Sequence, residues 1–161
     1  MGGWKGDRAL VRDTGREMTE QSTTSDLVRL ARQGYEAASR GDLDALMSLY
    51  AADAVYDLSA LGLETFEGAE AIRGFNEDWF RSWEEYRFEV EELLDFGHGV
   101  VLSVVREGGR LVGGDGRVEH KVAHLATFAN GKIEWQKAYF DLDEARAAAE
   151  RLAAERANTS E

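Results

Sequence analysis

Two histidines in the segment EHKVAH, His120 and His124, have side chains suited to proton transfer near neutral pH. On a helix, a pair spaced i, i+4 could share a metal ion, but the surrounding pattern predicts a β-strand. On a strand the two imidazoles share a face about 13 Å apart, which is too far to bind one ion. The sequence therefore predicts neither a metal site nor a cofactor. Each histidine could be a general acid or base, or a hydrogen-bonded structural residue.

Three aromatic residues, Phe75, Trp79 and Trp83, recur at helical spacing after Gly68, where a helix is expected to begin. Such a face normally packs into a core, and it can also line a pocket if the helix crosses the mouth of a half-open sheet. The glycine-rich GGDG at 113–116 is expected to be a turn, because it lacks the following helix and the Lys-Ser/Thr pair of a phosphate-binding loop.

The elements that position these residues follow from periodicity. Helical spacing predicts helices over 25–41, with Ser25 as N-cap, over 42–50, with Asp42 as N-cap, and over 68–86. Alternation predicts strands at 54–58, 87–94, 100–106, 118–128 and 132–140, with a hairpin at Asn130-Gly131. An alanine-rich helix ends the chain. Helices segregated from antiparallel strands predict an α+β fold.

Composition narrows the class of protein. The formal charge of −12 arises from 31 acidic and 19 basic residues, and a surface this acidic repels nucleic acid. The absence of cysteine excludes disulfides and thiolate metal sites. No segment has the pattern of a membrane helix or a signal peptide, so we expect a soluble, cytoplasmic protein. Residues 1–24 are expected to be a disordered leader, 25–157 one domain, and 158–161 a flexible tail.

Three segments, YEAASRGDLDALMSLYAADAVYD, FEGAEAIRGF and VEHKVAHLATFANGKIEWQKAYFD, resemble the SnoaL-like branch of the nuclear transport factor two-like superfamily over about residues 26–150. The resemblance implies a cone-shaped, curved antiparallel sheet packed around N-terminal helices and enclosing a pocket. It also implies a homodimer formed through the sheet. Relatives include ketosteroid isomerase, limonene epoxide hydrolase, scytalone dehydratase and polyketide cyclases, together with binding and assembly modules that have no catalytic activity.

Several catalytic positions of these relatives are changed in this chain. The resemblance places Leu58 where the isomerase has its aspartate base and the hydrolase an asparagine. It places Ala138 where the cyclases and the hydrolase have an aspartate. The isomerase's catalytic tyrosine falls at Gly34, with Tyr35 beside it. Because leucine and alanine cannot transfer protons, the usual bases of these three chemistries are missing.

Other positions keep polar side chains. His124 falls where the isomerase has its proton-donating acid and the cyclases a histidine, and Tyr56 aligns with a pocket tyrosine of the hydrolase. These two residues are the predicted catalytic groups, and Gln136 is expected to orient the substrate. The other residues predicted to line the pocket are Leu58, Phe75, Trp79, Trp83, His120, Val122, Ala138 and Phe140. The predicted dimer interface on the outer sheet face consists of Ile133, Trp135 and Tyr139.

Three functions are compatible with these residues. The first is an enzyme in which His124 transfers a proton next to a carbonyl, in an isomerisation, cyclisation or dehydration of a small apolar molecule resembling a polyketide, steroid or terpenoid. The second is a protein that binds such a molecule without catalysis, since Leu58 and Ala138 replace the usual bases. The third is a dimeric assembly module that uses the outer face of the sheet.

Overall fold

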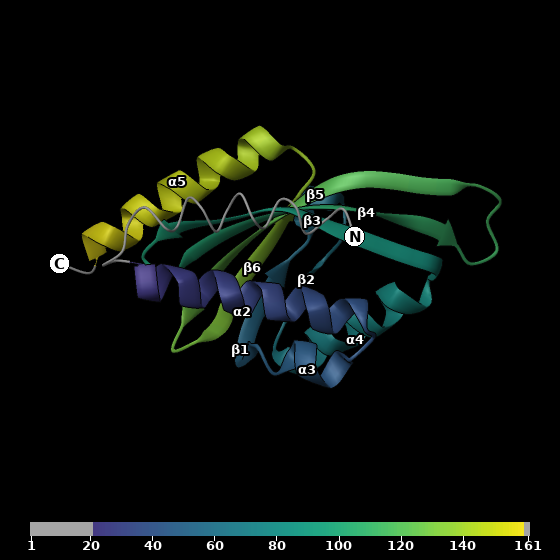
Figure 1. Cartoon of the computed structure of the whole chain (residues 1–161), viewed down its shortest axis with the longest axis horizontal. Coiled ribbons are helices and arrows are strands. Elements are labelled where there is room, and N and C mark those ends of the chain that lie inside the picture. Colours follow the sequence, from purple (N-terminus) through teal and green to yellow (C-terminus); the bar gives the residue numbers. More distant parts are fainter. Residues whose placement is uncertain (1–20, 160–161) are drawn as a thin grey trace.

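The computed structural model describes residues 21–159, and their side chains from residue 26 onward. Most of the predicted leader and the last two residues of the predicted tail lie outside this range. Within the described range there are four helices of more than one turn (Figure 1): α2 (Gln21–Ser39), α3 (Leu43–Met47), α4 (Ala69–Arg81) and α5 (Leu142–Thr159).

Six strands form a single sheet in the order β2-β1-β6-β5-β4-β3. The strands are β1 (Tyr50–Asp57), β2 (Thr65–Glu67), β3 (Trp83–Gly97), β4 (Val100–Leu111), β5 (Arg117–Ala129) and β6 (Lys132–Tyr139). Strands β3 to β6 form an antiparallel meander, whereas β1 pairs with β6 in parallel. The α+β fold is confirmed, but the sheet is mixed rather than wholly antiparallel. The long connection from β1 through α4 and the meander permits this parallel pairing.

Two helices begin or end differently from the prediction. Helix α2 starts at Gln21, four residues before the predicted cap Ser25, so residues 21–24 of the predicted leader are helical. At the other end of the chain, α5 extends into the predicted tail as far as Thr159. Asp42 caps α3 as predicted, by accepting a 3.1 Å hydrogen bond from the backbone N–H of Ala45. This helix is short, because the residues from Tyr50 onward pair with other strands.

Helix α4, which carries Phe75 and Trp79, is also shorter than the predicted range of 68–86. It ends at Arg81, and Trp83 and Tyr86 lie on β3. Strand β4 continues to Leu111, and its backbone pairs with the start of β3, where Trp83 is opposite Leu111. This cross-strand pairing prevails over the helical spacing of the aromatic residues. The short strand β2 lies between the predicted strand at 54–58 and the predicted helix from 68, where no element was expected, and it pairs with β1.

The two faces of the sheet are covered by different helices. In Figure 1, α5 lies on one face, and α2, α3 and α4 lie on the other. The alanines of α5 recur at helical spacing, and their small side chains allow the helix to pack closely on β4, β5 and β6. The core between α5 and the sheet is separate from the core on the inner face of the sheet. Its buried residues are Val100, Leu102, Ala123, Leu125, Tyr139, Ala145, Ala148, Ala149 and Ala153.

The predicted dimer interface is wrong in its residues. Tyr139 is 5% exposed beneath α5, and Trp135 packs against the same cluster. Ile133 lies on the opposite, inner face. The reason is a bulge in β6: Thr127 pairs with Trp135 and Phe128 with Ile133, so one residue is inserted and the alternation of side chains reverses. Within residues 21–159, no helix is long and apolar enough to span a membrane.

Candidate functional site

A cavity of about 340 Å³ lies between the inner face of the sheet and helices α2, α3 and α4. This volume falls within the usual range for small-molecule sites. Most of its wall is apolar, and aromatic rings from α4 and β3 form much of one side. Polar side chains are confined to a few positions, and two groups of them are built on pairs of residues from β4 and β5.

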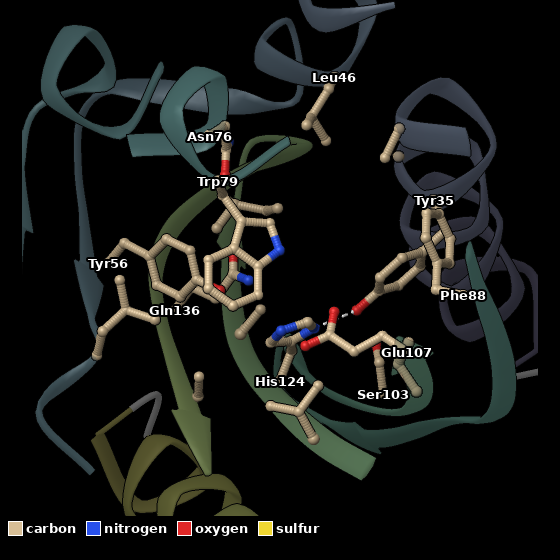
Figure 2. Close-up of a pocket in the computed structure, with 18 of the residues that line it drawn as sticks. Tyr35, Leu46, Tyr56, Asn76, Trp79, Phe88, Ser103, Glu107, His124 and Gln136 are labelled. Atoms are coloured by element: carbon tan, nitrogen blue, oxygen red, sulfur yellow. Dashed lines mark hydrogen bonds between the residues drawn. The ribbon is translucent and has the colours of Figure 1, made fainter. Parts of the chain in front are cut away.

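The first group centres on His124 of β5. Its Nδ1 atom is 2.7 Å from the hydroxyl oxygen of Tyr35, which comes from α2. Figure 2 shows the Tyr35 hydroxyl directed at the imidazole inside the cavity. The two rings are stacked with centroids 6.0 Å apart. Ser103 pairs with His124 across β4 and β5 and also lines the cavity.

The environment of His124 favours the neutral imidazole. Burial lowers the pKa of His124, and the negative charge of Glu107 opposes this effect only in part. Burial also raises the pKa of Tyr35 well above its usual range, so this phenol keeps its proton. With Nδ1 bonded to Tyr35, the Nε2 atom of His124 has no hydrogen-bond partner among the described residues. A neutral imidazole in this position can donate or accept one proton at Nε2.

Tyr56 and Gln136 lie next to this group on β1 and β6, where they pair with each other. The ring of Tyr56 stands edge-on to His124, with centroids 6.4 Å apart. Tyr56 is 6% exposed, and its hydroxyl has no hydrogen-bond partner among the described residues. Gln136 accepts a 2.7 Å hydrogen bond from the hydroxyl of Tyr50, which fixes its amide group. The Tyr56 hydroxyl is therefore free to donate to a ligand.

The second group lies four residues further along the same two strands. Glu107 of β4 pairs with His120 of β5, and its Oε2 atom is 2.8 Å from His120 Nε2. Its Oε1 atom accepts a short hydrogen bond from the hydroxyl of Tyr86. Trp79 Nε1 is 3.5 Å from the same hydroxyl. Glu107 is only 8% exposed, so the carboxylate is buried but held by two donors.

Most residues predicted for the wall do border the cavity: Tyr56, Leu58, Phe75, Trp79, His120, Val122, His124, Gln136, Ala138 and Phe140. Trp83 does not. It stands behind Trp79 and Tyr86, with ring centroids 5.7 Å and 5.4 Å away, because it begins β3 instead of continuing α4. Phe140 lies at the mouth, where it is 53% exposed. The roles assigned to these residues stay predictions.

Sequence reasoning missed Tyr35 and Glu107 as site residues. Tyr35 lies on the apolar stripe of α2, beside the position that the resemblance marked, and this proximity could have identified it. Glu107 lies one residue beyond the predicted end of its strand. Continuing the alternation through Ser103 and Val105 would have placed it on the cavity face. The hydrogen bond between Glu107 and Tyr86 could not be predicted, because the sequence pattern placed Tyr86 on a helix.

Residues 31–135 match the SnoaL-like domain family, which is more than half of the chain. The chain belongs to this family. This match confirms the resemblance to SnoaL-like proteins that the sequence motifs indicated. The sequence matches none of the curated proteins. In the part of this SnoaL-like protein that the structure describes, no three His, Asp or Glu side chains gather as metal ligands.

Solved structures with the same fold extend this result. An NTF2-like protein of unknown function from Burkholderia pseudomallei has 23% identity and a TM-score of 0.64, with 74% of this chain and 93% of that chain covered. A protein with a ketosteroid isomerase-like fold from Catenulispora acidiphila, in complex with trimethylamine, has 22% identity and a TM-score of 0.62, covering 73% and 89%. An LEH-like epoxide hydrolase from M. tuberculosis has 17% identity and a TM-score of 0.62, covering 80% and 92%. At these identities the similarities show the fold alone.

Proposed function

We propose that this SnoaL-like protein binds a small, largely apolar carbonyl compound and catalyses proton transfer next to the carbonyl, with His124 as the acid and base. The observation that carries the proposal is the His124 imidazole. Its Nδ1 atom is fixed by Tyr35 at 2.7 Å, and its Nε2 atom is without a partner among the described residues lining the cavity. A neutral imidazole oriented in this way is suited to general acid-base catalysis.

The hydrogen bonds around His124 support both directions of transfer. In the tautomer in which Nδ1–H donates to the Tyr35 oxygen, Nε2 has a free electron pair and acts as base. It takes a proton from the carbon next to the carbonyl, and the electron pair of the C–H bond moves into an enolate. The Tyr56 hydroxyl donates a hydrogen bond to the enolate oxygen. The imidazolium then returns the proton to another carbon, which gives an isomer, or to a leaving hydroxyl, which gives a dehydrated product. A positioned acid or base of this kind contributes about 10²–10⁴-fold.

A second function, ligand binding without catalysis, is favoured by Leu58 and Ala138. Both border the cavity, and neither can accept a proton. On this alternative, Tyr35 serves to satisfy a buried imidazole, and the cavity selects a ligand by shape and by the few polar groups of its wall.

Hydrogen–deuterium exchange distinguishes the two functions without knowledge of the natural substrate. Small cyclic ketones, 1-tetralone and 3-methylcyclohexanone, are incubated with the protein in D₂O, and loss of their α-proton signals is followed by proton NMR. We expect the protein to accelerate exchange, and His124→Asn to reduce the acceleration by about 10²-fold or more. Asparagine is the appropriate replacement because its amide can still form a hydrogen bond with the Tyr35 hydroxyl, as acceptor or as donor, but cannot transfer a proton.

Tryptophan fluorescence in the same samples reports whether the ketones bind, because Trp79 borders the cavity. Ketones that bind to both proteins and exchange equally fast with both would refute catalysis by His124 and support the binding function. Tyr56→Phe provides a further comparison, since it removes the proposed donor to the enolate and should slow exchange without preventing binding.

The assembly hypothesis requires a different surface from the one predicted. A homodimer of this protein would have to form through residues other than Ile133, Trp135 and Tyr139, since these lie in the cavity wall or pack with α5. We retain the dimer and the cytoplasmic location as expectations. Sedimentation of the purified protein tests the first, and fractionation of cells that produce it tests the second.

A further inference from the structure

The charges around the cavity are unbalanced. Glu107 is the only acidic residue among those described as lining it, and no lysine or arginine lines it. The carboxylate is 8% exposed, and its two hydrogen bonds come from the phenol of Tyr86 and the imidazole of His120. Burial lowers the pKa of His124, so the other cavity imidazole adds no positive charge at neutral pH. When His120, whose Nε2 atom lies 2.8 Å from Glu107 Oε2, is not protonated, the cavity has a negative potential that is weakly screened by water.

Aromatic rings surround the groups that hold Glu107. The ring of Tyr86 lies 5.8 Å from the rings of both Phe80 and Phe88, and its hydroxyl contacts Trp79. On the other side, the ring of Phe140 stands edge-on to His120 with centroids 5.5 Å apart. Phe80, Phe88, Trp79 and Phe140 all line the cavity. A buried carboxylate in a cavity whose neighbouring wall is aromatic is an arrangement that attracts organic cations.

We propose that the Glu107 end of the cavity binds a substituted ammonium group, with the carboxylate as its counter-charge and the surrounding rings as its walls. A cation there relieves the cost of a buried carboxylate and gains attraction from the ring faces. An anionic group is repelled by Glu107, and a neutral group gains neither contribution. The inference deepens the proposed function, because it rests on the cavity being the ligand site, but it does not require catalysis.

The spacing of the two polar groups constrains the shape of the ligand. Ser103 and His124 form one pair across β4 and β5, and Glu107 and His120 form the next, four residues along both strands. Four residues of β-strand span about 13 Å. Val105 and Val122 pair between the two groups and leave an apolar stretch. A ligand that engages both groups is elongated, with its ammonium at Glu107, an apolar middle, and its oxygen at His124.

A matched series of probes tests this inference. Benzyltrimethylammonium, its neutral isostere neopentylbenzene, and benzylphosphonate differ mainly in charge. Their affinities are measured by tryptophan fluorescence at pH 8, above the usual imidazole pKa of about 6.5. We expect the cation to bind at least about tenfold more tightly than the neutral isostere, and the phosphonate not to bind measurably. Glu107→Gln should bring the cation and the neutral isostere to similar affinity, while the affinity for the isostere changes less than about twofold.

Two further variants keep the outcome interpretable. Gly74→Ala, on α4 but outside the cavity lining, should leave the preference for the cation unchanged. If Glu107→Gln does not fold, Phe88→Leu removes one ring face and should reduce the preference for the cation. Equal binding of the cation and the neutral isostere by the unaltered protein would overturn the ammonium inference while leaving the proposed function intact. Failure of every probe to bind would contradict both, because both need the cavity as a ligand site.

Discussion

Replacing Tyr35 with phenylalanine isolates the hydrogen bond that fixes the His124 ring. The substitution removes one hydroxyl and keeps the ring, which packs edge-to-face against Phe88 with centroids 6.0 Å apart. The lost contact is the 2.7 Å hydrogen bond to His124 Nδ1. The half-buried imidazole would then have no partner for Nδ1 within the protein. Losing a hydrogen bond at such a site costs about 0.5–1.5 kcal/mol of the free energy of unfolding.

The effect is measured by urea unfolding and by thermal melting. In a domain of this size each kcal/mol lowers the melting temperature by about 2–4 °C. The matched control is Tyr56→Phe. Tyr56 is another tyrosine of the cavity wall, but its hydroxyl has no hydrogen-bond partner among the described residues. We expect Tyr56→Phe to change the free energy of unfolding by less than about 0.5 kcal/mol.

The comparison gives a clear criterion. Equal effects of Tyr35→Phe and Tyr56→Phe would refute the view that Tyr35 and His124 form a structural and functional pair. Nitrogen NMR of the imidazole adds a second measurement, because loss of the Tyr35 hydroxyl should change the Nδ1 chemical shift, whereas loss of the Tyr56 hydroxyl should not affect Nδ1 directly.

Two further predictions concern stability. Burial lowers the pKa of His124, so the unfolded chain binds its proton more readily, and stability should fall as the pH drops through about 6.5. His124→Asn should remove this component, at most about 1.4 kcal/mol per pH unit in urea titrations from pH 8 to 5, and an identical pH profile for both proteins would contradict it. Gly108→Ala should destabilise by about 1–3 kcal/mol, because its Cβ would lie 2.2 Å from the backbone oxygen of Val118. Gly74→Ala, in α4 with open space around it, should instead stabilise by up to about 1 kcal/mol; the opposite order of these two variants would show that the β4–β5 spacing is not tight.

Local patterns in the sequence were sufficient for the elements and for several inward-facing residues. Asn130 and Gly131 have φ angles of 55° and 77°, which the two-residue turn between β5 and β6 requires and which these residue types tolerate. The alternation along β5 places His120, Val122 and His124 on one face, because side chains on a strand alternate regardless of what the strand packs against. The segregation of helices from strands was sufficient for the fold class.

The tertiary structure decided which groups meet. Tyr35 and His124 are 89 residues apart, and no local pattern indicates that one bonds the other. The Glu107 group depends on β3 beginning at Trp83, an outcome of pairing with β4 that outweighs helical spacing. Periodicity shows that a residue shares a face with its neighbours, but not which element covers that face. For this reason the sequence alone determined the apolar cavity face and His124 on it, whereas long-range packing determined the partners of His124, the buried carboxylate of Glu107 and the covering of the outer face by α5.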